Sequence, residues 1–312
     1  MIGDSRSEAY KRRRAAVRVH STRRALPDLP IMSPSVSVVI PIFNGLHHLD
    51  EALESVVTQT HADLEIVLVD GGSTDGSREW MHGVKDTRVR VLEMPAGTTA
   101  AGNWTAASSA ARGDFVKLLC QDDLLHPQAI EHQLADLTAH EGALMAVAQR
   151  DVIDARGSVL FHHWGCAGLS AGVVDGRTAL LAAYLHGTNV FGEPVAILFR
   201  REALDAALPW NDDRPFLLDL ELYSRILAKG PIVVRREAVG SFRVSDSSWS
   251  TRLVATQSAQ MRAWQEEVEA RLSPTMGQRL KARTSLHSRK LLRRVAYRAL
   301  KTRGSFASAG QR

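Results

Sequence analysis

Apolar and polar positions alternate in blocks along the first 130 residues of the chain. Four short apolar runs are typical of strands: "VSVVIPIF" (36–43), "LEIVLVD" (64–70), "VRVLEM" (89–94) and "FVKLLC" (115–120). The segments between them have helical spacing, and a further helix is expected from Pro127. Strands that are apolar throughout and alternate with helices predict an α/β fold, with a mostly parallel sheet covered by helices on both faces.

The remainder of the chain has a less regular pattern. Residues 139–164 predict a pair of strands, residues 193–204 contain another apolar run, and residues 216–230 predict an amphipathic helix. Helical patterns then continue from residue 250 to 301. We therefore expect a large α/β unit followed by helices.

Polar clusters follow three of the predicted strands. They are "PIFNG" (41–45), "DGGSTDG" (70–76) and "CQDD" (120–123). In open sheets of this kind, ligands bind beyond the carboxyl ends of the strands. The three clusters therefore predict a ligand site at that edge of the sheet.

The adjacent carboxylates Asp122 and Asp123 are the most specific feature of these clusters. A single aspartate would suffice to cap the helix that follows, where a negative charge is favourable. A second carboxylate repels the first unless a cation lies nearby, and Mg²⁺ or Mn²⁺ is commonly held by one or two carboxylates together with substrate oxygens. We interpret the pair as a metal site, with helix capping as the alternative.

Asp70 ends the second predicted strand and begins a glycine-rich turn. Gly71 and Gly72 permit a tight turn, and Ser73 or Asp75 can cap the next helix. The spacing matches neither a P-loop nor a dinucleotide-binding fingerprint. Two interpretations stay open: an ordinary strand-turn-helix connection, or an Asp70 carboxylate that accepts a hydrogen bond from a base or ribose.

The net charge of +5 is unevenly distributed. Residues 1–30 carry +5 and residues 271–312 carry +12, which leaves −12 for the residues between them. An acidic body with basic ends does not fit a nucleic-acid groove across the fold. It fits a body that binds a cation and tails that meet an anionic partner.

Cysteine content and hydropathy bear on the compartment. Two cysteines cannot build a disulfide framework or a cysteine-rich zinc site. No apolar stretch approaches the roughly 18–20 residues of a spanning helix, and the first thirty residues lack the apolar core of a signal peptide. We therefore expect a cytoplasmic protein.

The segments "VSVVIPIFNG", "EIVLVDGGSTDGS" and "ARGDFVKLLCQDDLLHP", in this order, resemble the nucleotide-sugar-binding half of family 2 glycosyltransferases, which have the GT-A fold. The resemblance covers residues 35–130 well and continues more loosely to about residue 250. It implies transfer of a sugar from a nucleoside diphosphate donor to an acceptor hydroxyl, with inversion and with Mg²⁺ or Mn²⁺ as cofactor. It also makes cell-envelope polysaccharide or glycolipid assembly an expectation.

The resemblance also implies roles for individual residues. Asp122 and Asp123 would occupy the metal motif, with Asp122 also touching the donor. The expected nucleotide-sugar contacts are Pro41, Phe43, Asn44, Asp70 and Asn103. Three positions depart from the family pattern: Gly71 and Cys120 replace carboxylates, and Gly102 replaces the arginine of an Arg-Asn pair.

An inverting transfer needs a carboxylate that takes the proton of the acceptor hydroxyl. Asp219 and Glu221 stand two apart at the start of a predicted helix, so only one can easily reach the acceptor. The position of the family's acidic motif favours Asp219. The alternative for Asp219 is a surface charge at a helix N-terminus.

Three further residues are candidates for contacts with the acceptor or with phosphate: Glu193, Arg243 and Ser245. Glu193 follows a glycine and could bind acceptor hydroxyls, or it could pair with Arg200 or Arg201. Arg243 and Ser245 belong to a segment where family members often place a histidine near the diphosphate. A solvated loop is the alternative for that segment.

We expect three parts in the chain: a basic N-terminal arm (1–34), a GT-A domain (35–250) and a basic helical extension (251–312). The GT-A domain divides into a nucleotide-sugar half (35–130) and an acceptor half (131–250). In "SLHSRKLLRRVAYRALKTRG", apolar residues at 291–299 share one helical face, which would fit an anionic membrane surface, the catalytic body or an acidic partner. Peripheral contact with the inner face of a membrane is therefore one expectation.

Two rival functions remain at the level of sequence. A sugar nucleotidyltransferase would need a glycine-rich, basic loop after the first strand, and "PIFNGLHHLDEAL" has none. A catalytically degenerate scaffold or binding protein is the second rival, because Cys120 stands where a carboxylate is expected.

Overall fold

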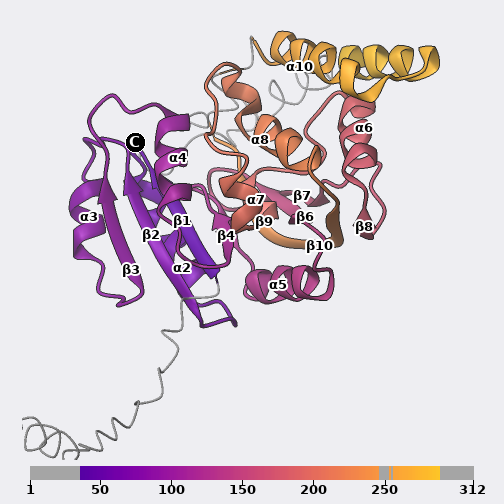
Figure 1. Ribbon diagram of the computed structural model, residues 1–312. Helices are drawn as coiled ribbons and strands as arrows, with labels where there is room; N and C mark the ends of the chain where they lie inside the picture. Colours follow the sequence, from indigo (N-terminus) through magenta and orange to yellow (C-terminus); the bar gives the residue numbers. More distant parts are fainter. Residues whose placement is uncertain (1–35, 246–252, 254–255, 289–312) are drawn as a thin grey trace, which may run out of the picture. The chain divides into compact units, whose positions relative to one another are not determined.

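The computed structural model describes residues 36–245, 253 and 256–288 (Figure 1). The predicted arm at 1–34 and the basic tail at 289–301 lie outside the described residues. In the described part of the chain, ten strands form one sheet with the order β3-β2-β1-β4-β9-β6-β10-β5, and β7 and β8 pair with β6 and β10. The strands are β1 (Val36–Ile42), β2 (Leu64–Asp70), β3 (Val89–Glu93), β4 (Phe115–Leu118), β5 (Leu124–Leu125), β6 (Met145–Ile153), β7 (Val159–Trp164), β8 (Gly172–Val174), β9 (Ile197–Arg200) and β10 (Ile232–Arg243).

Pairing in the sheet changes between β4 and β9. The strands β3, β2, β1 and β4 are mutually parallel, as the sequence predicts. Beyond them, β9 is antiparallel to both β4 and β6, β10 is parallel to β6, and β7 is antiparallel to β6. We call the boundary between β4 and β9 the seam.

Helices cover both faces of the sheet. They are α2 (Leu46–Val57), α3 (Ser77–Gly83), α4 (Ala100–Ser109), α5 (Ala129–Ala139), α6 (Gly176–His186), α7 (Arg201–Asp205), α8 (Leu218–Leu227) and α10 (Gln257–Leu272), with the short 3-10 turns η1 (Pro194–Ala196) and η2 (Pro215–Leu217). Residues 276–288 are also helical. Among the described helices, none is long and apolar enough to cross a membrane.

Side chains that alternate along the strands divide between two cores. Val39 and Val67 face the core formed with α4, α6, α8 and α10. Ile40 and Leu68 face the core formed with α2, α3 and α5. Because every residue of β1 and β2 is buried, both strands need apolar side chains on both faces.

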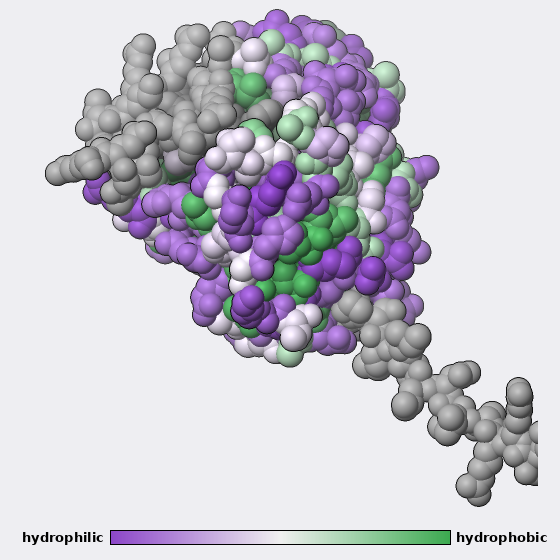
Figure 2. Space-filling model, turned by 90° about the vertical axis from the view of Figure 1, so that its left-hand side faces the viewer, coloured by the Kyte–Doolittle hydropathy of each residue, from purple (hydrophilic) through white to green (hydrophobic). Residues whose placement is uncertain are grey.

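The edge strand β3 is only partly buried. Figure 2 views the molecule from the side on which β3 and α3 lie in Figure 1, and it shows a hydrophobic patch among hydrophilic residues. The central strands β1 and β4 are enclosed, and their carboxyl ends carry the predicted site residues.

Candidate active site

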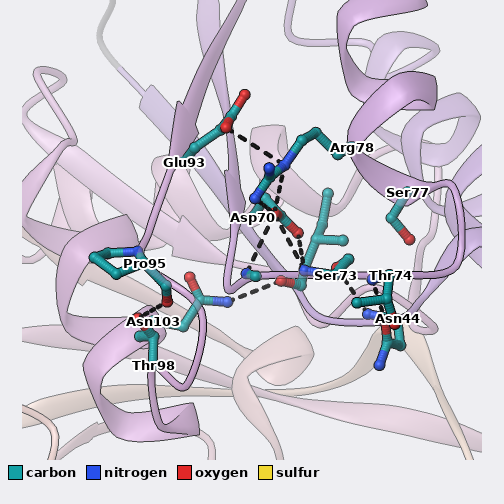
Figure 3. A network of polar contacts seen from close by, with 12 residues as sticks. Asn44, Asp70, Ser73, Thr74, Ser77, Arg78, Glu93, Pro95, Thr98 and Asn103 are labelled. Atoms are coloured by element: carbon teal, nitrogen blue, oxygen red, sulfur yellow. Dashed lines mark hydrogen bonds and ion pairs between the residues drawn. The ribbon is translucent and has the colours of Figure 1, made fainter.

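The loops that follow β1 and β2 are hydrogen-bonded to each other (Figure 3). The backbone N–H of Asn44 donates to Ser73 Oγ (2.9 Å), and Asn44 Oδ1 accepts from the backbone N–H of Thr74 (2.8 Å). Asn44 has a φ of 50°, a conformation that asparagine adopts more readily than most residues. The two predicted clusters therefore form one connected surface at the carboxyl end of the sheet.

Asp70 is buried, and both of its carboxylate oxygens accept hydrogen bonds (Figure 3). The backbone N–H of Ser73 donates to Oδ1 (3.0 Å), while the N–H of Gly72 (3.2 Å) and the guanidinium of Arg78 (3.1 Å) donate to Oδ2. Burial opposes ionisation, but hydrogen bonds from Ser73, Arg78 and Gly72 outweigh it and lower the pKa of Asp70. These contacts fix the turn, and recognition of a base by Asp70 stays a prediction.

Asn103 lies in the first turn of α4 and reaches across to β1. Its Nδ2 donates to the carbonyl oxygen of Ile42 (3.0 Å), which also accepts from the N–H of Gly71 (2.7 Å). A Cβ at position 71 would lie 2.9 Å from Asn103 Nδ2, so the glycine leaves room for this contact. Asn103 Oδ1 is buried and has no hydrogen-bond partner among the described residues.

Pro41 and Phe43 differ in accessibility. Pro41 is buried within β1, whereas the Phe43 side chain lies beyond the strand and is 52% exposed. The backbone of Phe43 is held by the side-chain amide of Gln121, from the segment after β4. Phe43 is thus accessible beyond the end of β1 and Pro41 is not, and contact of either residue with a base or ribose stays a prediction.

Asp123 is buried, and only one of its carboxylate oxygens has a protein partner. The backbone N–H of Arg243 donates to Oδ1 (3.0 Å), while Oδ2 is buried without a partner among the described residues. Burial, and then the charge of Asp122, raise the pKa of Asp123 well above its ordinary value. Burial also raises the pKa of Asp122, against the opposing charge of Arg243. Both carboxylates therefore lie where a cation would favour their ionised forms.

Arg243 lies beneath the acidic pair and is 1% exposed. Its Nε donates to the carbonyl oxygen of Asp122 (2.9 Å), and its Nη2 pairs with Glu51 on α2 (2.6 Å). Ser245, two residues later, is also buried. The structure therefore places Arg243 as a support of the acidic segment, whereas contact of Arg243 or Ser245 with phosphate stays a prediction.

Asp219 lies in the first turn of α8 and is partly exposed. Its Oδ2 accepts from Asn189 Nδ2 (2.7 Å), and its Oδ1 accepts from the backbone N–H of Leu220 (2.6 Å). Burial, followed by the negative charge of Glu193, raises the pKa of Asp219 to about 7 despite these hydrogen bonds. A carboxylate with this pKa and some access to solvent is suited to accept a proton near neutral pH.

Glu193 pairs with Arg150, not with Arg200 or Arg201. Arg150 Nε and Nη2 each lie 2.6 Å from Glu193 Oε2, and Arg150 Nη1 donates to the carbonyl oxygen of Trp164 (3.0 Å). Arg200 and Arg201 instead donate to backbone carbonyls of neighbouring segments. The predicted pairing with Arg200 or Arg201 is wrong. Those arginines are close to Glu193 in the sequence, but Arg150 reaches Glu193 from β6, which lies next to β9 in the sheet.

Glu221, the rival of Asp219, is engaged elsewhere. Its Oε1 lies 2.8 Å from Arg214 Nη1, which places it in an ion pair. Burial raises the pKa of Glu221, and the charge of Arg214 acts against that rise. The contacts therefore favour Asp219 over Glu221 as a base, in the direction that the sequence predicts.

The acids from both sides of the seam converge on Cys120. Burial raises the pKa of the Cys120 thiol well above its ordinary value, and the negative charges of Asp123, Asp122, Asp219 and Glu193 raise it further. Charges act on one thiol in this way only when they lie near it. The predicted metal residues and the predicted base therefore both lie close enough to Cys120 to act on it electrostatically, and their union in one active site stays a prediction.

The residues present fit a metal that is shared with a substrate. In the described part of the chain, no group of three or more His, Cys, Asp and Glu side chains has the arrangement of a complete metal centre. Mg²⁺ and Mn²⁺ do not require one, because one or two carboxylates and phosphate oxygens suffice. The unpartnered Asp123 Oδ2 is the atom that such an ion would satisfy.

Four contributors to the site were not predicted from sequence: Gln121, Lys117, Arg150 and Asn189. Lys117 is a buried lysine in β4 whose Nζ donates to Gln133 Oε1 (2.7 Å) and the carbonyl oxygen of Val195 (2.6 Å). Burial lowers the pKa of Lys117 well below its ordinary value, against the charge of Asp123. A single lysine within the apolar run "FVKLLC" was the available signal.

The chain is similar in sequence to known proteins. The profile of the family described as "Glycosyl transferase family 2" matches residues 37–208. Glycosyltransferase GlyG of Streptococcus pneumoniae serotype 4 is 38% identical over 102 residues, a match that covers 32% of this chain and 34% of GlyG. The chain thus spans about a third of the length of that relative.

Solved structures share the fold at low sequence identity. Residues 1–349 of S. aureus TarS, in complex with UDP, superimpose with a TM-score of 0.57 and 17% identity, over 76% of this chain and 70% of that fragment. The mannosyltransferase PcManGT of Pyrobaculum calidifontis, in complex with GDP-Man and Mn²⁺, gives a TM-score of 0.55 and 19% identity, over 91% and 78% of the two chains. The match of the family profile to more than half of the chain shows that this protein belongs to family 2 of the glycosyltransferases, and its α/β fold is of the GT-A type.

Proposed function

We propose that this protein transfers a sugar from a nucleoside diphosphate sugar to an acceptor hydroxyl, with inversion at the anomeric carbon. The observation that carries the proposal is the presence of two held pairs of carboxylates: Asp122 and Asp123, where Asp123 Oδ2 has no partner among the described residues, and Asp219 and Glu193, which Asn189 and Arg150 hold. The first pair suits a cation and a diphosphate, and the second suits a hydroxyl that loses a proton. A transfer in one displacement step needs both pairs of carboxylates near the same anomeric carbon.

In this reaction the acceptor oxygen forms a bond to the anomeric carbon as the bond from that carbon to the diphosphate oxygen breaks. Asp219 takes the proton of the acceptor hydroxyl, and the electron pair of the broken bond leaves with the nucleoside diphosphate. Because the attacking oxygen and the leaving group lie on opposite faces of the carbon, the configuration inverts. Glu193, held by Arg150, would accept a hydrogen bond from the acceptor.

Mg²⁺ or Mn²⁺ is the cofactor that we propose, held by Asp122 and Asp123. When bound, it would neutralise negative charge that develops on the leaving diphosphate. The complex of PcManGT with GDP-Man and Mn²⁺ supports this choice, because that protein shares the fold. Phe43 and Asn44 directly follow β1, Asp70 ends β2, and Asn103 contacts Ile42 at the end of β1, so these residues would bind the nucleotide.

The acceptor that we propose is a saccharide or a lipid-linked saccharide, in keeping with the predicted role in the cell envelope. A cytoplasmic location, with peripheral membrane contact through the basic tail, stays a prediction, since that tail lies outside the described residues.

Thermal-shift measurements against a panel of nucleoside diphosphates and nucleotide sugars, with and without Mn²⁺, test the proposal. A ligand present at 100 times its dissociation constant stabilises the folded state by about 2.7 kcal/mol, so the correct donor should raise the melting temperature only with the metal. Donor turnover with a mixed saccharide acceptor then tests transfer. Stabilisation by a sugar phosphate and a nucleoside triphosphate would favour the nucleotidyltransferase, and binding with no turnover would favour a scaffold.

A further inference from the structure

The segment from Asn189 to Glu193 is organised around a single side-chain amide. Asn189 Oδ1 accepts from the backbone N–H groups of Phe191 (3.0 Å) and Gly192 (3.2 Å). Asn189 Nδ2 donates to the carbonyl oxygen of Gly192 (2.9 Å) and to Asp219 Oδ2 (2.7 Å). The amide thus uses both donors and its acceptor, and only one of these four contacts leaves the segment.

That one contact reaches the carboxylate proposed as the base. Asp219 Oδ2 is held by Asn189, and Oδ1 is held by the backbone N–H of Leu220 (2.6 Å), so the plane of the carboxylate is set from two sides. The same segment ends at Glu193, whose carboxylate is fixed by Arg150 (2.6 Å). Asn189 therefore sets the position of Asp219 relative to Glu193.

Several charged and titratable groups face Asp219 from the elements packed around it. Glu193 approaches from the segment before η1, Cys120 from the end of β4, and Tyr223 from α8 itself. Asp122 and Asp123 act on the same thiol as Asp219, and Arg150 supplies the positive charge beside Glu193. Asn189 is a neutral donor to the carboxylate among these mostly acidic neighbours, and a donor favours the ionised form of a carboxylate.

We propose that Asn189 is a positioning residue that orients the Asp219 carboxylate towards the acceptor and stabilises its ionised form. This inference rests on the proposed function of Asp219, and it adds a residue that sets the pH at which the base works. The polar atoms of the Asn189 side chain are hydrogen-bonded to the backbone of its own segment and to Asp219. Asn189 would therefore contact neither the acceptor oxygen nor the anomeric carbon.

Two substitutions test the role of Asn189. Asn189→Asp keeps the shape and both contacts from the N–H groups of Phe191 and Gly192, but it places a carboxylate against Asp219 Oδ2. Asn189→Ala removes all four contacts. Asn211→Asp is the matched control, because Asn211 makes the same kind of contacts, to Asp213, in an exposed loop.

The first measurement is the dependence of kcat on pH at saturating donor. We expect the acid limb to move to higher pH by about one unit or more in Asn189→Asp and by less in Asn189→Ala, since a nearby like charge shifts a carboxylate more than the loss of a neutral donor. The donor KM should stay within about twofold of the wild-type value, because Asn189 acts on the acceptor side. Asn211→Asp should leave both quantities unchanged.

The second measurement requires no substrate. The ¹³C resonance of the Asp219 carboxyl, assigned by its loss in Asp219→Asn, is titrated in each variant, and its midpoint should move in the same direction as the acid limb. If the wild-type enzyme transfers no sugar, the proposed function fails while this titration still tests Asn189. An unchanged midpoint in folded Asn189→Asp, or a loss of kcat that is equal at every pH, would overturn the proposal.

Discussion

The side-chain amide of Gln121 forms two hydrogen bonds with the backbone of Phe43. Gln121 Oε1 accepts from the Phe43 N–H (2.7 Å), and Gln121 Nε2 donates to the Phe43 carbonyl oxygen (3.1 Å). The segment after β4, which carries Asp122 and Asp123, is thereby fastened to the loop after β1, which carries the exposed Phe43 ring. The proposed nucleobase contact, Phe43, and the proposed metal residues are therefore linked by direct hydrogen bonds between their two segments.

Gly45 makes this pairing feasible, because a Cβ at that position would lie 2.3 Å from Gln121 Oε1. We expect Gly45→Ala to displace Gln121 and to raise the Kd for the nucleotide by about tenfold, measured by isothermal titration calorimetry; that change corresponds to 1.4 kcal/mol of binding free energy. Gly83→Ala is the control, since nothing lies within 4 Å of a Cβ there. The double variant Gly45→Ala/Gln121→Ala should be less defective than the sum of the single changes. Strict additivity would contradict the steric account.

Asp122→Asn and Asp123→Asn should each abolish sugar transfer and remove the effect of Mn²⁺ on nucleotide binding, because the amide carries no charge for the metal. The melting temperature of Asp123→Asn should hold or rise, since burial disfavours the charged carboxylate. Asp114→Asn is the control at the other end of β4, where the carboxylate is 71% exposed. Full activity of both variants in excess chelator would refute the metal site.

Asp219→Asn should lower kcat by about 10² to 10⁴, the usual contribution of a placed general base, and leave donor affinity unchanged. Glu221→Gln should lower kcat much less, because Glu221 is paired with Arg214. Steady-state kinetics with both variants decide the ranking. The reverse order would assign the base to Glu221.

Asp219 also predicts a dependence of stability on pH. Its pKa is raised to about 7 in the folded state, so the folded protein binds a proton more tightly than the unfolded chain does. The stabilisation linked to that proton is fully present below about pH 4 and is lost as the pH rises through 7. At pH 8, Asp219→Asn should therefore melt at a higher temperature than the wild type, by roughly 2–4 °C for each kcal/mol.

The difference in melting temperature between Asp219→Asn and the wild type should shrink towards pH 4, where Asp219 is protonated in both states. Asp114→Asn should show no such trend, because its carboxylate is exposed. A constant offset between the melting curves across pH 4–8 would show that Asp219 is not titrating in this range.

Arg243→Gln distinguishes support of the acidic segment from direct contact with phosphate. Arg243 is buried and its guanidinium donates to the carbonyl oxygen of Asp122, so its loss should lower the melting temperature even without ligand. Arg235→Gln serves as control, because the Arg235 side chain, which pairs with Asp136, is 22% exposed. If Arg243 served only to bind phosphate, the ligand-free protein would melt normally and only the donor KM would rise.

The first half of the fold was predictable because its signals are local. The apolar runs of β1 and β2 are buried on both faces, so their hydrophobicity shows directly in the sequence. Asp70, Asp122 and Asp123 could be recognised as candidate site residues because each stands at the end of an apolar run in the sequence. Partners that depend on strand order, such as Arg150 with Glu193 or Gln121 with Phe43, are separated by 43 and 78 residues, and no local pattern predicts them.

The buried Lys117 illustrates a second limit. A lysine within an apolar run is usually expected at a surface. Its amino group is accommodated because α5 supplies Gln133 and the segment before β9 supplies the carbonyl oxygen of Val195. Neither contact is visible until the elements are packed together.

The seam between β4 and β9 also bears on how such a protein can diversify. The residues that hold Asp219 and Glu193, namely Asn189 and Arg150, come from the same side of the seam as the acids they hold. Under the proposed function, exchange of that side between related proteins would replace the acids proposed for the acceptor and leave the proposed nucleotide contacts in place. Arg243 limits such an exchange, because it belongs to β10 but contacts Asp122 and Glu51 on the other side of the seam. A transplanted second half must therefore carry its own equivalent of Arg243.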